Sequence, residues 1–263
     1  MRPCTVSILL VTAAAAVVAA PALRSAEPLP APVVVELFTS QGCSSCPPAD
    51  RLLARLARES SGAVMPLAFH VDYWNHGGWS DPFSSAAWTA RQALYDQRLH
   101  ATEYTPQAVV DGETELVGSR EAELRSAIAD AARRPAAKLE LSLAPSGQSV
   151  VVAVGVTVPP ELEGRKFDLM LAVTENGLET RVVGGENGGQ TLHDDAVVRT
   201  FRRIGRIHGA QAAPRFTETV KLAPEWSRPN LSVVAFLQDR STLEILGGAA
   251  APLASSAAAH DGR

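Results

Sequence analysis

The feature that most constrains the fold is a pair of cysteines placed between an apolar strand and a helix. Residues 33–38 (VVVELF) are almost all apolar, which is typical of a central strand covered on both faces. A short polar turn follows, and over residues 49–57 alanine and leucine recur at helical spacing. The sequence therefore predicts that Cys43 and Cys46 lie at a strand-to-helix junction.

This position favours a reactive thiol. The start of a helix carries unpaired N–H groups and the positive end of the helix dipole, and both favour an anion. A thiolate is such an anion, so the pKa of a cysteine there is lowered. The hydroxyl groups of Ser44 and Ser45 can donate hydrogen bonds to it. We expect thiol–disulfide exchange at Cys43 and Cys46, and a Cys43 sulfur sealed inside the fold would count against it.

Two other interpretations of the cysteines remain open. One is a structural disulfide in a non-catalytic, partner-binding module, although closing so short a loop restricts the unfolded chain very little. The other is a copper or zinc site made by Cys43 and Cys46 with His70 or His76. The ligand spacing matches no strong zinc pattern, so the favoured interpretation includes no metal and no cofactor.

The first residues of the chain predict export. Arg2 precedes an apolar run, and Ala20-Pro21-Ala22 fits a cleavage site, so residues 1–22 are typical of a signal peptide. The run is shorter than the roughly 20 apolar residues of a membrane span, and an uncleaved anchor is the alternative. We expect a periplasmic or secreted protein with no stable membrane insertion after signal cleavage.

The charge of the chain bears on its partners. A formal net charge of −4 and a pI near 5.9 argue against nucleic acid or an anionic membrane surface as the main partner. Together with the cysteine pair, this leaves protein thiols or disulfides as the expected partners.

The pattern along the chain changes near residue 136. Strand and helix patterns alternate over residues 32–135, which predicts a compact α/β unit. Over residues 137–252 short alternating strands are separated by Gly, Pro and Asn turns, which predicts an antiparallel sandwich. Residues 23–31 are expected to form a disordered leader and residues 253–263 a flexible tail.

Three features in order resemble the thioredoxin superfamily. They are the strand that leads into Cys-x-x-Cys at a helix start, Thr105-Pro106 before the next strand, and a closing hairpin and helix. The segments LFTSQGCSSCPPAD, AFHVDYW, YTPQAVVDG and GGENGGQTLHDDAVVR are similar to a secreted bacterial group, the domain-of-unknown-function 1223 family. We therefore predict a thioredoxin-like α/β domain followed by an all-β immunoglobulin-like sandwich domain.

The resemblance also implies roles for single residues. Cys43 would be the exposed attacking thiolate and Cys46 the buried resolving thiol. Pro106 would be cis and pack against the cysteines, with Thr105 presenting backbone to an extended substrate; an ordinary trans turn proline is the alternative. Glu36 lies near the place of a buried acid on the first strand, one residue further from the first cysteine than usual.

An aromatic loop follows the second predicted strand. Tyr73, Trp74 and Trp79 are candidates for partner contacts, because aromatic anchors are enriched at interaction hot spots. The alternative is that they cover the edge of the core while the nearby histidines are solvated.

A glycine-rich segment, residues 184–190 (GGENGGQ), lies in the second predicted unit. It lacks the Gly-Lys-Ser/Thr ending of a phosphate-binding loop, so a flexible connection between strands is expected. The polar residues that follow it, His193, Asp194 and Asp195, are expected to be solvated.

Overall fold

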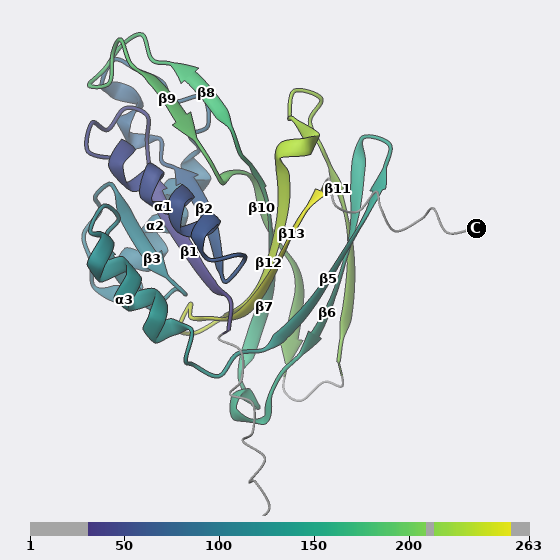
Figure 1. Cartoon of the computed structure of the whole chain (residues 1–263). Helices are drawn as coiled ribbons and strands as arrows, with labels where there is room; N and C mark the ends of the chain where they lie inside the picture. The colour runs from purple at the N-terminus through teal and green to yellow at the C-terminus, as the bar shows by residue number, and fades with distance from the viewer. Residues whose placement is uncertain (1–30, 209–212, 254–263) are drawn as a thin grey trace, which may run out of the picture.

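The computed structural model describes residues 31–208 and 213–253 (Figure 1). The predicted signal peptide, nearly all of the leader and nearly all of the tail lie outside these residues. None of the helices in the described ranges is long and apolar enough to span a membrane.

The part of the chain that carries the cysteines alternates between strands and helices. In chain order the elements are β1 (Val33–Thr39), α1 (Pro47–Glu59), β2 (Val64–His70), a short 3-10 helix η1 (Tyr73–His76), α2 (Ala86–Leu99), β3 (Gln107–Val110), β4 (Thr114–Val117) and α3 (Glu121–Ala131). Two of these helices begin at signals that the sequence offers: prolines occupy the first turn of α1, and the Ser85 side chain caps α2.

The rest of the described chain is almost entirely β-strand. Its strands are β5 (Lys138–Ser146), β6 (Ser149–Thr157), β7 (Lys166–Glu175), β8 (Leu178–Arg181), β9 (Thr191–Asp194), β10 (Val197–His208), β11 (Arg215–Lys221), β12 (Leu231–Asp239) and β13 (Ile245–Pro252). Two short 3-10 helices, η2 (Pro160–Leu162) and η3 (Arg228–Asn230), lie between strands.

Eight strands from both halves of the chain form one mixed sheet, in the order β13-β12-β7-β10-β2-β1-β3-β4. The halves join where β10 runs parallel to β2: Val197 pairs with Ala68, and the Ala68 N–H donates to the Ala196 carbonyl (2.9 Å). The predicted thioredoxin-like α/β domain followed by a separate immunoglobulin-like sandwich is therefore wrong. An uncovered edge of β2 would leave backbone groups unpaired, and β10 pairs with part of that edge.

Helices and a second sheet cover this large sheet. Alternate residues of β1, Val33, Val35 and Leu37, pack with α1 and α3 on one face, while Val34 and Phe38 pack with the α2 side on the other. Further along, β7 and β12 pack against a three-stranded sheet with the order β11-β6-β5.

The strands β8 and β9 form a separate two-stranded sheet. Figure 1 shows this hairpin extending past the end of the large sheet, on the side of α1. Its tip comes close to the turn between β1 and α1, where the two cysteines lie.

Candidate functional site

The centre of the candidate site is a disulfide between Cys43 and Cys46. Cys46 is the N-cap residue of α1, and its carbonyl accepts the N–H of Ala49 (2.8 Å). Pro47 and Pro48 have no N–H to donate. The start of α1 therefore offers the sulfur atoms its dipole but fewer hydrogen-bond donors than an ordinary helix start.

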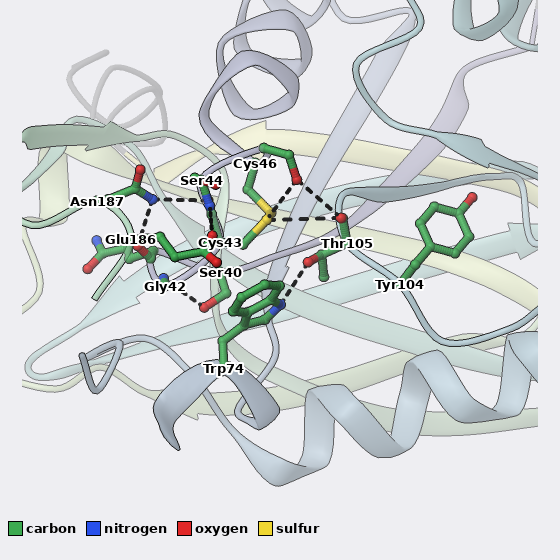
Figure 2. Close-up of a disulfide and its surroundings, with 12 residues drawn as sticks. Ser40, Gly42, Cys43, Ser44, Cys46, Trp74, Tyr104, Thr105, Glu186 and Asn187 are labelled. Carbon is green, nitrogen blue, oxygen red and sulfur yellow. Dashed lines mark hydrogen bonds between the residues drawn. A yellow bond between two sulfur atoms is a disulfide. The ribbon is translucent and has the colours of Figure 1, made fainter. Parts of the chain in front are cut away.

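Thr105 and Pro106 lie beside the disulfide. The peptide bond between them is cis, which confirms the prediction. The Ser45 hydroxyl lies 3.3 Å from Cys43 Sγ and donates to the Thr105 carbonyl (3.5 Å). The indole N–H of Trp74 donates to Thr105 Oγ1 (2.8 Å). Figure 2 shows Thr105 on one side of the disulfide and Trp74 below it.

The opposite side is covered by residues 182–190, which connect β8 to β9 and which we call the strap. Asn187 is buried, and its side-chain amide donates to the backbone carbonyls of Gln41 (2.9 Å) and Cys43 (3.0 Å). The Glu186 carboxylate accepts the backbone N–H of Ser44 (3.0 Å). Figure 2 shows both strap residues next to the turn that carries Cys43. This segment, expected to be only a flexible connection, is docked on the site.

The strap and the Thr105 side together bury both cysteines, which are 0% exposed. The expectation that Cys43 is exposed is therefore wrong for this structure. The physical reason is long-range: Asn187 reaches Cys43 from 144 residues away in the sequence, which no local pattern reveals. In this arrangement a partner protein cannot reach either sulfur directly.

A buried polar cluster lies behind the disulfide. The Asp81 carboxylate is 2.7 Å from His70 Nδ1 and accepts the backbone N–H of Gln41 (2.8 Å). The side chain of Gln41 donates to Asp194 (2.7 Å) and accepts the indole N–H of Trp79 (3.2 Å). The cluster fastens the turn before Cys43 to β2, the aromatic loop and β9. Sequence reasoning missed this cluster: it expected Asp194 to be solvated, and it considered His70 as a metal ligand or as a solvated side chain.

Burial and pairing shift the pKa values in this cluster. Burial opposes the charged form of His70, but the Asp81 carboxylate outweighs it and raises the pKa of His70 to about 9. Burial also opposes the charged form of Asp81, yet His70 keeps the pKa of that carboxyl below its usual value. Burial raises the pKa of Asp194, and it raises the pKa of Asp50, on α1, to about 7. At neutral pH the cluster therefore holds a charged histidine and a partly protonated Asp50.

Glu36, predicted to support the cysteines, is not part of the site. Side chains alternate along β1, and Val35 and Leu37 face α1, so Glu36 faces the α2 side. There its carboxylate forms a buried ion pair with Arg91 (2.6 Å). Because most residues of β1 are apolar, the sequence pattern does not indicate which face of the strand α1 covers.

The alternative metal set is not assembled either. Cys43 and Cys46 are bonded to each other, and His70 is held by Asp81. Across residues 31–208 and 213–253, no group of three or more His, Cys, Asp and Glu side chains is arranged to hold a metal ion.

The three aromatic candidates are half-buried and hydrogen-bonded within the molecule. The Tyr73 hydroxyl donates to the Gln92 side chain (3.3 Å), while Trp74 and Trp79 bind parts of the site as described above. Both indoles therefore help to fix the surroundings of the disulfide, and partner contact by these residues stays a prediction.

Comparisons with known proteins place this architecture in a family. Protein AGR_C_4864 from Agrobacterium tumefaciens superposes with a TM-score of 0.63 at 26% identity, covering 84% of this chain and 94% of that one. HBP35 of Porphyromonas gingivalis superposes with a TM-score of 0.64 at 17% identity, covering 87% of this chain and 77% of that one, and shows a likeness of fold alone. No curated protein matches the sequence. The family model described as "Protein of unknown function (DUF1223)" matches residues 34–238, which include the whole candidate site, and the chain therefore belongs to the DUF1223 family.

Proposed function

We propose that this protein is a thiol–disulfide oxidoreductase that acts on exported proteins through Cys43 and Cys46. The observation that carries the proposal is the disulfide at the start of α1, beside the backbone of Thr105. The two cysteines are only three positions apart, so their bond constrains the unfolded chain little and a purely stabilising role is a weak explanation. Export is the expectation that residues 1–22 provide.

The exchange proceeds in two steps. In the reduced protein, the Cys43 thiolate attacks a disulfide of the partner, forms a mixed disulfide, and displaces one partner sulfur as a thiolate. The Cys46 thiol then loses its proton and attacks Cys43, which restores the Cys43–Cys46 bond and releases the second partner thiolate. The partner gains two electrons and the protein loses two; the same steps in reverse oxidise a partner dithiol. The Ser45 hydroxyl, 3.3 Å from Cys43 Sγ, can donate to the thiolate.

One observation favours a second candidate function. Both sulfur atoms are fully buried, as they would be in a partner-binding module with a fixed disulfide. In that case the aromatic loop around Trp74 and Trp79 would contact the partner, and no covalent intermediate would form.

A trapping experiment separates these functions. In Cys46→Ala the second step cannot occur, so mixed disulfides through Cys43 should accumulate when the exported protein is expressed in a bacterial host. We expect reductant-sensitive adducts in Cys46→Ala and none in the matched control Cys43→Ala. A folded Cys46→Ala protein that captures no partner would contradict the exchange function and support the fixed disulfide.

A further inference from the structure

The strap connects the closed structure to the proposed chemistry. We infer that residues 182–190 control access to the disulfide, with Asn187 as the anchor that holds the strap closed. The inference rests on the proposed function and specifies how that same site is regulated: exchange at Cys43 requires the strap to leave.

The side-chain hydrogen bonds that hold the strap on the site are few. Asn187 contributes two hydrogen bonds, to the Gln41 and Cys43 carbonyls, and Glu186 contributes one, from the Ser44 N–H. Water can replace each of these bonds when the strap leaves, so the net free energy that holds it closed is a fraction of their gross strength.

Of the two segments that cover the disulfide, the strap is the one that can move away as a unit. It is the tip of the β8–β9 sheet, whose backbone is not paired with the eight-stranded sheet. At the base of the strap, Asp194 on β9 accepts a hydrogen bond from the Gln41 side chain (2.7 Å). The strap's own backbone is closed by bonds from the Val182 N–H to the Gln190 carbonyl and from the Gly189 N–H to the Val182 carbonyl (both 2.9 Å). A segment with internal bonds and few external ones can open as a unit.

Thr105 and Trp74, which cover the disulfide on the other side, are far more constrained. Thr105 leads directly into β3, which is paired with both β1 and β4. Trp74 is tied to Thr105 by its indole N–H and packs against the core on the α2 side. Moving this side would disturb the large sheet, whereas moving the strap would not.

Close packing between two glycines allows the strap to dock on the aromatic loop. Gly184 lies against the backbone carbonyl of Gly78 in the aromatic loop, and a Cβ at Gly184 would collide with that carbonyl. The neighbouring Gly185 has a positive φ of 68°. Glycine is thus required here for close approach, which explains why a segment that reads as flexible can dock so tightly.

Opening would change the chemistry of the site as well as its exposure. In the closed state the Glu186 carboxylate accepts the backbone N–H of Ser44, the residue that follows Cys43, and a nearby negative charge disfavours a thiolate. When the strap leaves, that charge leaves with it and the Ser44 N–H becomes free. The open state therefore presents both a reachable sulfur and a more favourable setting for its anion.

The test measures how fast a small phosphine, tris(2-carboxyethyl)phosphine, reduces the disulfide in the folded full chain. Phosphorus attacks one sulfur and breaks the S–S bond, and water then yields the phosphine oxide and two thiols, so the reaction needs no partner protein. We expect Asn187→Ala to raise the second-order rate constant about tenfold or more, equivalent to about 1.4 kcal/mol for each factor of ten. Gly184→Ala should also accelerate reduction, because the added Cβ would collide with the Gly78 carbonyl and keep the strap from closing.

The matched control is Asn176→Ala, at the base of the same hairpin. Asn176 Oδ1 accepts the Ala196 N–H (2.7 Å), which lies away from the disulfide. Removing this hydrogen bond should leave the rate of disulfide reduction unchanged. If Asn187→Ala does not fold, Glu186→Ala at an exposed position replaces it, with an expected increase of about threefold.

Rates equal to wild type in Asn187→Ala and Gly184→Ala would overturn the inference, and so would an equal acceleration in Asn176→Ala. Faster reduction in the two strap variants without any trapped partner would support the strap and contradict exchange. Trapped partners with unchanged reduction rates would support exchange and contradict the strap.

Discussion

At the scale of single residues, Asp50 is an acid near the disulfide whose carboxyl group is incompletely hydrogen-bonded. Its Oδ1 atom is buried and finds no hydrogen-bond partner among the residues that the structure describes. Its amide N–H binds the Cys46 carbonyl one helical turn earlier, so it belongs to the same turn as the disulfide. His70 provides the opposing charge, yet burial dominates and the pKa of Asp50 rises to about 7.

This shift predicts a pH-dependent stability. The folded pKa of Asp50, about 7, lies above the unfolded value of about 3.9, so the folded state binds this proton more tightly. The stability contributed by the protonated carboxyl is present below about pH 4 and is lost as the pH rises towards 7. Asp50→Asn should therefore increase the free energy of unfolding by about 4 kcal/mol at pH 8 and leave it almost unchanged at pH 4.

Urea unfolding of both proteins at these two pH values measures the effect. The pKa of Asp111, also raised to about 7 by burial, is common to both proteins and cancels in the comparison. An equal change in stability at both pH values in Asp50→Asn would contradict the raised pKa of Asp50.

At the scale of elements, the strand, turn and helix around the cysteines could be predicted because their signals are local. The apolar run of β1 and the prolines of α1 lie within 15 residues of each other in the sequence, and the structure places β1 and α1 accordingly. The cis bond before Pro106 could be predicted from the resemblance and not from the residues themselves.

The docked strap could not be predicted, for a physical reason. Its glycines are equally compatible with a mobile loop and with close backbone packing, and only the neighbour decides between them. Here the neighbour is Gly78, more than 100 residues away in the sequence. Asn187 likewise has no local signal, because both of its acceptors belong to the turn between β1 and α1.

At the scale of the whole molecule, the large sheet joins what the sequence pattern separates. Alternation of apolar residues identifies strands but not their neighbours, so the pairing of β2 with β10 was not visible. A buried network adds to this connection: Arg91 on α2 pairs with Glu36 on β1 and donates to Gln238 on β12 (3.5 Å). The Tyr95 hydroxyl accepts from both Arg91 (3.0 Å) and Gln238 (2.8 Å).

A shared sheet and a shared network predict cooperative unfolding. Three of the four tryptophans, Trp74, Trp79 and Trp88, lie before residue 136, whereas most strand residues come after it. Urea unfolding followed by tryptophan fluorescence and by far-UV circular dichroism should therefore give coincident transitions. A fluorescence transition that precedes the loss of strand signal would show two independently stable units.

The reduction potential of the Cys43–Cys46 bond tests the proposed chemistry most directly. It is measured by equilibrating the full chain with glutathione and dithiothreitol buffers at pH 7 and counting alkylated thiols by mass. An exchanging pair is expected to fall between about −270 and −120 mV. A value below about −300 mV, typical of a structural disulfide, would contradict exchange at this site.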